Sequence, residues 1–266
     1  IYTSGSTGTP KGTLINHRAL ANHCYGICDA YQLTPKDRVL LFAPLNFDPS
    51  LEQSLPTLIS GATIVVRGPD IWSVTEVARR IIDLQLTIVN FPTAFWHVLV
   101  QEWEREGYNQ QRGALRTMIC GGDKMLLEMV KRWNRLGLKN VVLINAYGPT
   151  ETTVTATIAT NLNRSQFELS DIPIGRPLAN RKIYILDELL RPVPIGCSGD
   201  LYIAGESLSS GYLHHEQLTR DCFVFDPFSN NDDASMYKTG DRALFSESGD
   251  IYFQGRQDSQ IKINGF

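Results

Sequence analysis

Directly after its first residue, the chain reads Tyr2-Thr3-Ser4-Gly5-Ser6-Thr7-Gly8-Thr9-Pro10-Lys11-Gly12. Glycines let backbone N–H groups approach an anion, hydroxyls donate hydrogen bonds and lysine supplies positive charge, so the stretch suits a polyphosphate. It is not a Walker A loop, because Lys11 is followed by Gly12 rather than by Ser or Thr. The alternative is a flexible Gly/Ser loop that binds nothing.

Helix and strand patterns alternate after this loop, as far as about residue 160. They predict helices that begin at Asn16, Asp48, Ser73 and near Thr93, a helix over 125–136, and strands at 38–43, 62–66, 87–90, 117–120 and 141–144. This rhythm is typical of βαβ units with a mainly parallel sheet, whose ligands bind at the carboxyl ends of the strands.

The helix that begins at Asp48-Pro49 carries apolar residues at helical spacing. Its predicted buried face consists of Leu51, Leu55, Leu58 and Ile59. Asp48 is a good N-cap residue, and the proline after it fits the first turn.

From about residue 172 the runs become short and are separated by Gly, Pro, Asp and Ser. They predict strands at 182–186, 200–204, 243–245 and 251–253, with a hairpin turn at Ser248-Gly249-Asp250. The predicted fold class is therefore α/β, a mainly parallel sheet with flanking helices followed by a β-rich subdomain. We divide the chain into an α/β region (1–171), a β-rich region (172–255) and a terminal segment (256–266).

Composition excludes several classes of function. The 266 residues have a net charge of −3 with mixed signs, which disfavours a nucleic-acid partner. No apolar run approaches the roughly 20 residues that span a bilayer. Five scattered cysteines predict reduced thiols and a cytoplasmic location. The start at Ile1 and the end just after a strand-like run lead us to expect an internal fragment.

Four further motifs follow the first loop in order. They are Asn145-Ala146-Tyr147-Gly148-Pro149-Thr150-Glu151, the stretch from Gly199 to Leu213, Tyr237-Lys238-Thr239-Gly240-Asp241, and the stretch from Gly255 to Ile263. Together with residues 2–12, they resemble the signature motifs of the acyl-adenylate-forming (AMP-binding) superfamily, and especially of nonribosomal peptide synthetase adenylation domains. The resemblance covers the whole chain. It implies that the chain forms part of the large N-terminal domain of that fold and that Asp258 is the hinge residue that follows this domain.

The resemblance assigns roles to residues that also suit them chemically. Thr150 and Glu151 offer oxygen ligands for Mg²⁺ and phosphate, and Asp241 offers two acceptors for a ribose diol. The implied catalytic residues are Thr3, Lys11, Thr150 and Glu151, with Glu151 as the metal ligand. The implied nucleotide contacts are Ser4, Gly5, Ser6, Thr7, Gly8, Gly121, Gly122, Asn145, Ala146, Tyr147, Asp241, Phe253 and Arg256. Tyr147 could instead be a core tyrosine, and Asp241 a turn residue.

Asp48 stands where the family's aspartate pairs with the α-ammonium group of an amino acid. The rest of the implied substrate pocket is Pro49, Glu52, Asn90, Ile119, Gly121, Ala146, Val154 and Thr155. Because Glu52 lies one helical turn after Asp48, we predict a polar or cationic substrate side chain rather than a large aromatic one. Two alternatives remain: Asp48 only caps its helix, and Glu52 only pairs with a basic residue. His23 is assigned to a helix flank and His97 to packing within an apolar helical stretch, both without a catalytic role.

The resemblance implies ATP-dependent formation of an aminoacyl-AMP, with Mg²⁺. Transfer to the phosphopantetheine thiol of a peptidyl carrier domain follows in the family, in chains that also hold a condensation domain. We expect the family's C-terminal domain and its catalytic lysine to lie outside these residues, and Asn264 and Ser209-Ser210 depart from the family pattern. The alternatives are an acyl- or aryl-CoA ligase, which Asp48 disfavours, and a degenerate nucleotide-binding module without catalysis.

Overall fold

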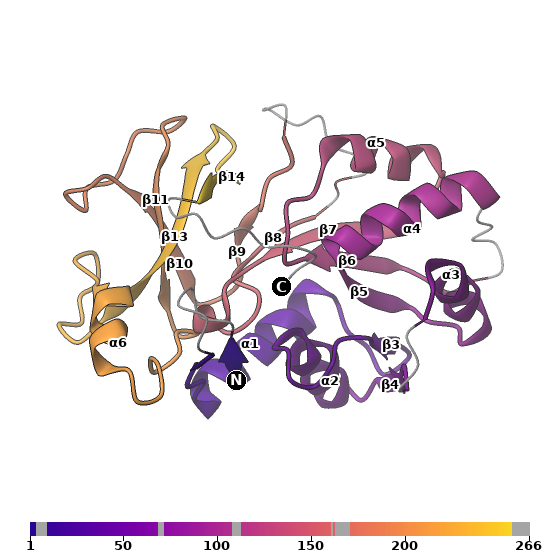
Figure 1. The fold of residues 1–266 in the computed structure, drawn as a ribbon, viewed down its shortest axis with the longest axis horizontal. Helices are drawn as coiled ribbons and strands as arrows, with labels where there is room; N and C mark the ends of the chain where they lie inside the picture. Colours follow the sequence, from indigo (N-terminus) through magenta and orange to yellow (C-terminus); the bar gives the residue numbers. More distant parts are fainter. Residues whose placement is uncertain (4–9, 69–71, 108–112, 161, 163–170, 257–266) are drawn as a thin grey trace.

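A computed structural model describes residues 1–3, 10–68, 72–107, 113–160, 162 and 171–256. These residues build a mixed α/β part and a β-rich part that lie side by side (Figure 1). At the start of the chain, β1 (Tyr2–Thr3) pairs antiparallel with β2 (Lys11–Gly12). The two ends of the first motif therefore lie next to each other.

The larger sheet has the strand order β4-β3-β5-β6-β7-β8-β9. Its strands are β3 (Arg38–Leu41), β4 (Thr63–Val66), β5 (Ile88–Pro92), β6 (Thr117–Gly121), β7 (Val142–Tyr147), β8 (Thr157–Ala159) and β9 (Arg176–Pro177). The strands from β4 to β7 in this order run parallel, whereas β8 and β9 add antiparallel pairs at one edge. The predicted strands of the first region are confirmed to within a few residues.

Helices cover both faces of this sheet (Figure 1). The helices α1 (His17–Ala30) and α2 (Pro49–Ile59) lie on one face, and α3 (Val74–Asp83), α4 (Thr93–Glu106) and α5 (Leu127–Arg135) lie on the other. Side chains alternate along each strand, so every strand supplies both layers. Val39 and Ile119 pack toward α1, whereas Leu40 and Met118 pack toward α3–α5.

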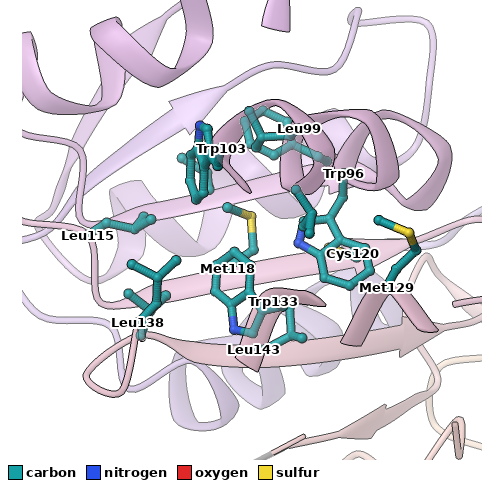
Figure 2. Packing of buried hydrophobic residues seen from close by; sticks show 14 of the residues in the cluster. Trp96, Leu99, Trp103, Leu115, Met118, Cys120, Met129, Trp133, Leu138 and Leu143 are labelled. Atoms are coloured by element: carbon teal, nitrogen blue, oxygen red, sulfur yellow. The ribbon is translucent and has the colours of Figure 1, made fainter. Parts of the chain in front are cut away.

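The core on the α3–α5 face is built around large aromatic side chains. Figure 2 shows Trp96 and Trp103 of α4 beside Trp133 of α5, packed over Met118 of the sheet. The ring centroids of Trp103 and Trp133 are 5.9 Å apart, and all three indoles are 0–1% exposed. Side chains of this size dominate the burial of apolar surface that stabilises such a layer.

Two of the predicted helix starts have the expected caps. The Asn16 side chain accepts a hydrogen bond of 2.9 Å from the Ala19 amide, and Ser73 accepts one of 3.2 Å from Glu76. The capping prediction for Asp48 is wrong. Asp48 already has helical backbone angles and makes no capping bond, and its carboxylate instead accepts the hydrogen bond from Thr150 described below.

The predicted buried face of α2 is also wrong. Leu58 and Ile59 are 60% and 51% exposed, whereas Glu52 and Gln53 are buried. The helix is anchored by polar contacts instead. The Gln53 side chain accepts hydrogen bonds from the amides of Phe42 and Ala43 and donates one to the Asn90 carbonyl. Because these partners satisfy its amide group, a polar face can point inward.

The second sheet is antiparallel, with the order β10-β11-β13-β12 and β14 paired to β13. Its strands are β10 (Arg181–Leu186), β11 (Gly199–Gly205), β12 (Phe223–Phe225), β13 (Ser235–Phe245) and β14 (Ile251–Arg256), and α6 (Glu216–Cys222) precedes β12. The predicted hairpin at 248–250 joins β13 and β14. The β-rich character of this region is confirmed, whereas β12 was not predicted.

A few bonds hold the two sheets together at the end of β7. The Asn145 side chain donates a 2.8 Å hydrogen bond to the Pro173 carbonyl, and the Ile174 amide bonds to Ile251. Tyr147 packs against the apolar cluster of the second sheet. The carboxyl end of β7 therefore faces the second sheet. In the described part of the chain, no helix has the length and apolarity to span a membrane.

Candidate functional site

Lys11 and Glu151 come from motifs 140 positions apart in the sequence, yet they form an ion pair. The Lys11 Nζ atom lies 3.3 Å from Glu151 Oε1 and donates a 3.1 Å hydrogen bond to the Tyr212 hydroxyl. Tyr212 in turn donates a 2.6 Å hydrogen bond to Glu151 Oε1. This arrangement collects a cation, a carboxylate and a hydroxyl beside the first loop.

The hydroxyl of Thr3 marks the entrance to that loop. Its oxygen is buried and has no hydrogen-bond partner among the described residues. A buried hydroxyl normally has a partner, so this atom suits an oxygen of a bound phosphate. The other implied contacts of the loop, Ser4, Gly5, Ser6, Thr7 and Gly8, lie outside the described residues, as does the hinge residue Asp258.

A second group of implied nucleotide contacts converges on Asp241 of β13. The Tyr147 hydroxyl donates to Asp241 Oδ2, and the Arg256 guanidinium donates a 2.9 Å hydrogen bond to Oδ1. Phe253 lies beside Tyr147, with ring centroids 6.5 Å apart. Burial and the negative charge of Asp241 raise the pKa of the Tyr147 phenol, so it stays a hydrogen-bond donor.

Tyrosines connect the two groups along one edge of the molecule. The hydroxyls of Tyr212 and Tyr237 are 3.4 Å apart, and Tyr237 lies on the same strand as Asp241. Lys11, Glu151 and Asp241 therefore lie on one side of the molecule, at the carboxyl end of β7. Only such an arrangement allows a single nucleotide to reach all three residues.

The backbone after β7 turns sharply to bring residues 150–155 back to the sheet. After the short 3₁₀ helix η2 (Thr150–Thr152), Thr153 and Val154 have φ angles of 59° and 63°, which β-branched residues rarely adopt. A Cβ atom on Gly148 would lie 2.2 Å from the Val154 carbonyl oxygen. Only glycine fits there, and the strained turn belongs to the site itself.

Asp48 joins the implied amino-acid pocket to the implied phosphate motif. The Thr150 hydroxyl donates a 2.6 Å hydrogen bond to Asp48 Oδ2. Pro49 occupies the first turn of α2 directly after it. The carboxylate thus lies next to η2, where a substrate bound beside the phosphate group would meet it.

Glu52 is buried in a polar cluster next to a cavity of about 10 Å³, the space of roughly one water molecule. Its Oε1 atom accepts hydrogen bonds from the Tyr31 hydroxyl (2.7 Å) and the Asn90 amide (3.1 Å), and its Oε2 atom lies 3.1 Å from His23 Nε2. Burial raises the pKa of Glu52, but His23 and the hydroxyls of Tyr31 and Thr155 outweigh it and hold the pKa below its ordinary value. Glu52 therefore lies against a histidine, in keeping with the alternative that it pairs with another residue of the chain.

The remaining implied pocket residues lie near this cluster. Asn90 and Ile119 line the same small cavity as Glu52, and Gly121 and Ala146 are paired across β6 and β7. Val154 and Thr155 are buried behind the turn. A larger hollow of about 670 Å³ lies between α1, β8, β9 and the 248–250 turn, and no predicted site residue lines it.

A profile described as "AMP-binding enzyme" matches residues 1–213. The chain belongs to the AMP-binding enzyme family. It is 37% identical to bacitracin synthase 1 from Bacillus licheniformis and 36% identical to tyrocidine synthase 1 from Brevibacillus parabrevis. Both alignments cover 100% of this chain, but only 5% and 23% of those proteins, so the chain spans less than a quarter of these relatives.

Solved structures of the family extend the likeness to the fold. Holo-PA1221, an NRPS protein containing adenylation and PCP domains, superposes with a TM-score of 0.87 and 28% identity over 99% of this chain and 44% of that one. The N-terminal subdomain of Klebsiella oxytoca NpsA, in complex with 3-hydroxybenzoyl-AMSN, gives 0.82 and 25% over 96% and 63%. The predicted fold class and the resemblance to nonribosomal peptide synthetase adenylation domains are confirmed.

Thr150 and Glu151 are the residues that would hold a Mg²⁺ ion in this family member. Within the described residues, no three His, Cys, Asp or Glu side chains form a metal-binding group. Mg²⁺ needs no such cage when it binds with a nucleotide, because phosphates and water complete its octahedron around one or two protein oxygens. Glu151 and Thr150 provide a donor set of that kind, so the residues fit a nucleotide-bound Mg²⁺ ion.

Sequence reasoning missed three residues of this site. The local sequence pattern marks neither Tyr31 nor Arg181 as a site residue, and His23 is predicted only to lie on a helix flank. His23 lies next to Cys24 on the buried face of α1, a position that could have indicated burial. Arg181 contacts His23 from the second sheet, and no local pattern predicts such a contact.

Proposed function

We propose that this chain is part of an adenylation domain that uses ATP to activate an amino acid as aminoacyl-AMP, with release of pyrophosphate. The observation that carries the proposal is the contact between Thr150 and Asp48, which links the phosphate motif to the carboxylate that suits an α-ammonium group. Acyl and aryl substrates carry no such charge, so an aspartate beside the phosphate residues favours an amino acid.

The reaction we propose joins a carboxylate oxygen of the amino acid to the α-phosphorus of ATP and breaks the bond from that phosphorus to the β-phosphate oxygen. Such a displacement needs alignment and neutralisation of developing charge. Thr3 and Lys11 hold the phosphates in this scheme, and Asp241 and Arg256 hold the ribose. Mg²⁺ bound at Glu151 and Thr150 would offset the charge on the phosphate oxygens.

The nucleotide's base lies in this proposal between the Tyr147 ring and the backbone of Gly121 and Gly122. Asn145 and Ala146 complete that side, and Phe253 supports Tyr147. A Cβ atom at Gly121 would lie only 2.8 Å from the Ala146 carbonyl oxygen, so the close packing of β6 against β7 favours glycine at this position. Aromatic stacking of this kind is tolerant of small shifts of the base.

We further propose that the product is passed to the phosphopantetheine thiol of a peptidyl carrier domain, in a larger chain that also holds a condensation domain. In that step a thioester forms and AMP leaves. Full rates would need the family's C-terminal domain with its catalytic lysine, which rotates about the hinge at Asp258. The natural location in this proposal is the cytoplasm, and the functional units are 1–171, 172–255 and the hinge segment 256–266.

The test is amino-acid-dependent exchange of pyrophosphate into ATP by the natural full-length protein. We expect exchange with one or a few amino acids and none with fatty or aryl acids. Glu151→Gln should reduce the rate at least about 100-fold, because a charged contact in the transition state is lost. Glu247→Gln, an exposed acid in the β13–β14 turn, is the matched control and should leave the rate unchanged.

Two other results would each favour another function. A preference for aryl or fatty acids would favour a CoA ligase of the same family. Aryl acids are included in the test because the similar structure of NpsA holds a 3-hydroxybenzoyl compound. ATP binding by calorimetry without exchange would favour a degenerate binding module.

A further inference from the structure

Arg181, His23 and Glu52 form a buried polar row that connects the second sheet to the substrate pocket. An N–H group of the Arg181 guanidinium lies 3.0 Å from His23 Nδ1, and His23 Nε2 lies 3.1 Å from Glu52 Oε2. The side chains of His23 and Glu52 are 0% and 1% exposed. Neither His23 nor Arg181 belongs to the residues that the family resemblance placed in the pocket.

The contact with Arg181 determines the protonation of His23. A guanidinium group has only donors, so the Nδ1 atom that faces it must carry a lone pair. The proton of a neutral imidazole then lies on Nε2, the atom that faces Glu52. His23 is therefore neutral, accepting from Arg181 and donating toward Glu52. The contact with Glu52 is bent, because its distance fits a hydrogen bond while its angle does not.

The row brings a full positive charge close to Glu52. Burial lowers the pKa of Arg181 to about 10 although Glu52 raises it, so the guanidinium stays protonated at neutral pH. It also donates to the Thr153 carbonyl at 3.4 Å, whereas Nε and the second terminal nitrogen have no hydrogen-bond partner among the described residues. A buried cation with so few partners needs a nearby anion, and Glu52 is the carboxylate that raises its pKa.

Glu52 in turn is enclosed, with hydrogen bonds to one of its two carboxylate oxygens. Oε1 accepts from Tyr31 and Asn90, and Oε2 faces His23. The charges of Glu52 and Arg181 cancel across a neutral histidine. A substrate ammonium group entering this pocket would meet a buried carboxylate whose charge Arg181 already offsets, and it would lose its hydration without an unpaired anion in return.

We propose that His23 is a positioning residue that determines specificity: it fixes Glu52 and couples it to Arg181, so that the pocket selects an uncharged polar side chain over a cationic one. The inference rests on the proposed function, because it concerns the side chain of the amino acid that is activated. It narrows the sequence prediction, which allowed a cation.

The experiment compares pyrophosphate exchange by the natural full-length protein and three variants, with serine, threonine, asparagine and glutamine against ornithine and lysine. We expect the unmodified protein to favour its best uncharged substrate at least about tenfold in kcat/KM. His23→Leu removes both contacts, so Glu52 Oε2 no longer faces an imidazole N–H group. The preference for uncharged substrates over cations should fall at least about tenfold, mainly through KM.

His23→Gln is the conservative variant, because an amide group can accept from Arg181 and donate to Glu52 at the same time. It should keep the preference within about threefold of the unmodified protein. His17→Leu, at an exposed position on the same helix, is the matched control and should change nothing. If His23→Leu does not fold, the unmodified protein and His23→Gln decide the question.

The inference is overturned if the unmodified protein prefers ornithine or lysine, or if a folded His23→Leu variant keeps the original preference. It is also overturned if His23→Gln loses the preference as fully as His23→Leu. Absence of exchange with every amino acid is a separate result, because it contradicts the proposed function itself.

Discussion

The Thr150 hydroxyl donates a 2.6 Å hydrogen bond to the Asp48 carboxylate, across 102 positions of sequence. Thr150 follows β7, whereas Asp48 precedes α2, so the bond joins two layers of the fold. It fixes the direction of a carboxylate that makes no helix cap. The position of the amino acid and that of the phosphate are thereby set by one contact.

The first prediction concerns the charge of Asp48. Asp48→Asn keeps an oxygen that can accept from Thr150 but loses the negative charge. We expect KM for the amino acid to rise about 10- to 100-fold in the exchange assay, because a hydrogen bond between charged groups is lost. KM for ATP should stay the same. Asp29→Asn, an exposed change on α1, is the control, and an equal rise in both KM values would contradict the assignment.

The second prediction concerns Asp241 and the ribose. Asp241→Asn removes a charged acceptor that Tyr147 and Arg256 hold in place, so KM for ATP should rise at least about tenfold. With the unmodified protein, replacing ATP by its 2′- or 3′-deoxy form should raise the KM for the nucleotide by a similar factor. With Asp241→Asn, the same replacement should raise the KM for the nucleotide much less. Additive losses would show that Asp241 does not contact the sugar.

The third prediction tests the close approach at Gly148. In Gly148→Ala the new Cβ atom would meet the Val154 carbonyl oxygen at 2.2 Å, so the turn that carries Thr150 and Thr155 must shift. We expect a loss of about 3 kcal/mol or more in the free energy of unfolding, measured by denaturant titration. Gly137→Ala, at a φ of 72° with open space around it, should cost only about 1 kcal/mol. Equal losses would refute the steric explanation.

The fourth prediction concerns stability in acid. Burial raises the pKa of Asp37, but hydrogen bonds from Arg116, Thr87 and Thr34 hold it well below its ordinary value. A depressed pKa stabilises the fold above the ordinary aspartate pKa of about 3.9, and this stabilisation is lost as the pH falls toward the folded-state value.

Asp37→Asn should therefore lower the free energy of unfolding by about 2 kcal/mol at pH 7, and the difference from the unmodified protein should shrink below pH 4. The value is modest because the Arg116 side chain is 34% exposed and water screens the pair. Asp83→Asn, in an exposed pair with Arg79, should change stability little at any pH. A difference that stays constant with pH would contradict the role of the charge.

The sequence predicted what local chemistry decides. The caps at Asn16 and Ser73, the parallel strands and the grouping of Lys11, Glu151 and Asp241 all follow from short patterns or from motifs in a recognisable order. The inward face of α2 did not follow, because Gln53 and Glu52 are buried by partners that lie far away in sequence. The role of Arg181 could not be predicted for the same reason, because its partner His23 is 158 positions away in the sequence.

All four tryptophans, Trp72, Trp96, Trp103 and Trp133, belong to the core on the α3–α5 face of the larger sheet. The residues grouped around Lys11 and Asp241 contribute tyrosines and a phenylalanine instead. Indole fluorescence will consequently report whether that single layer is intact. It will change little when a ligand binds near Lys11 and Asp241. Thermal unfolding followed by tryptophan fluorescence therefore measures the α3–α5 layer, whereas a ligand titration measures the other side of the molecule.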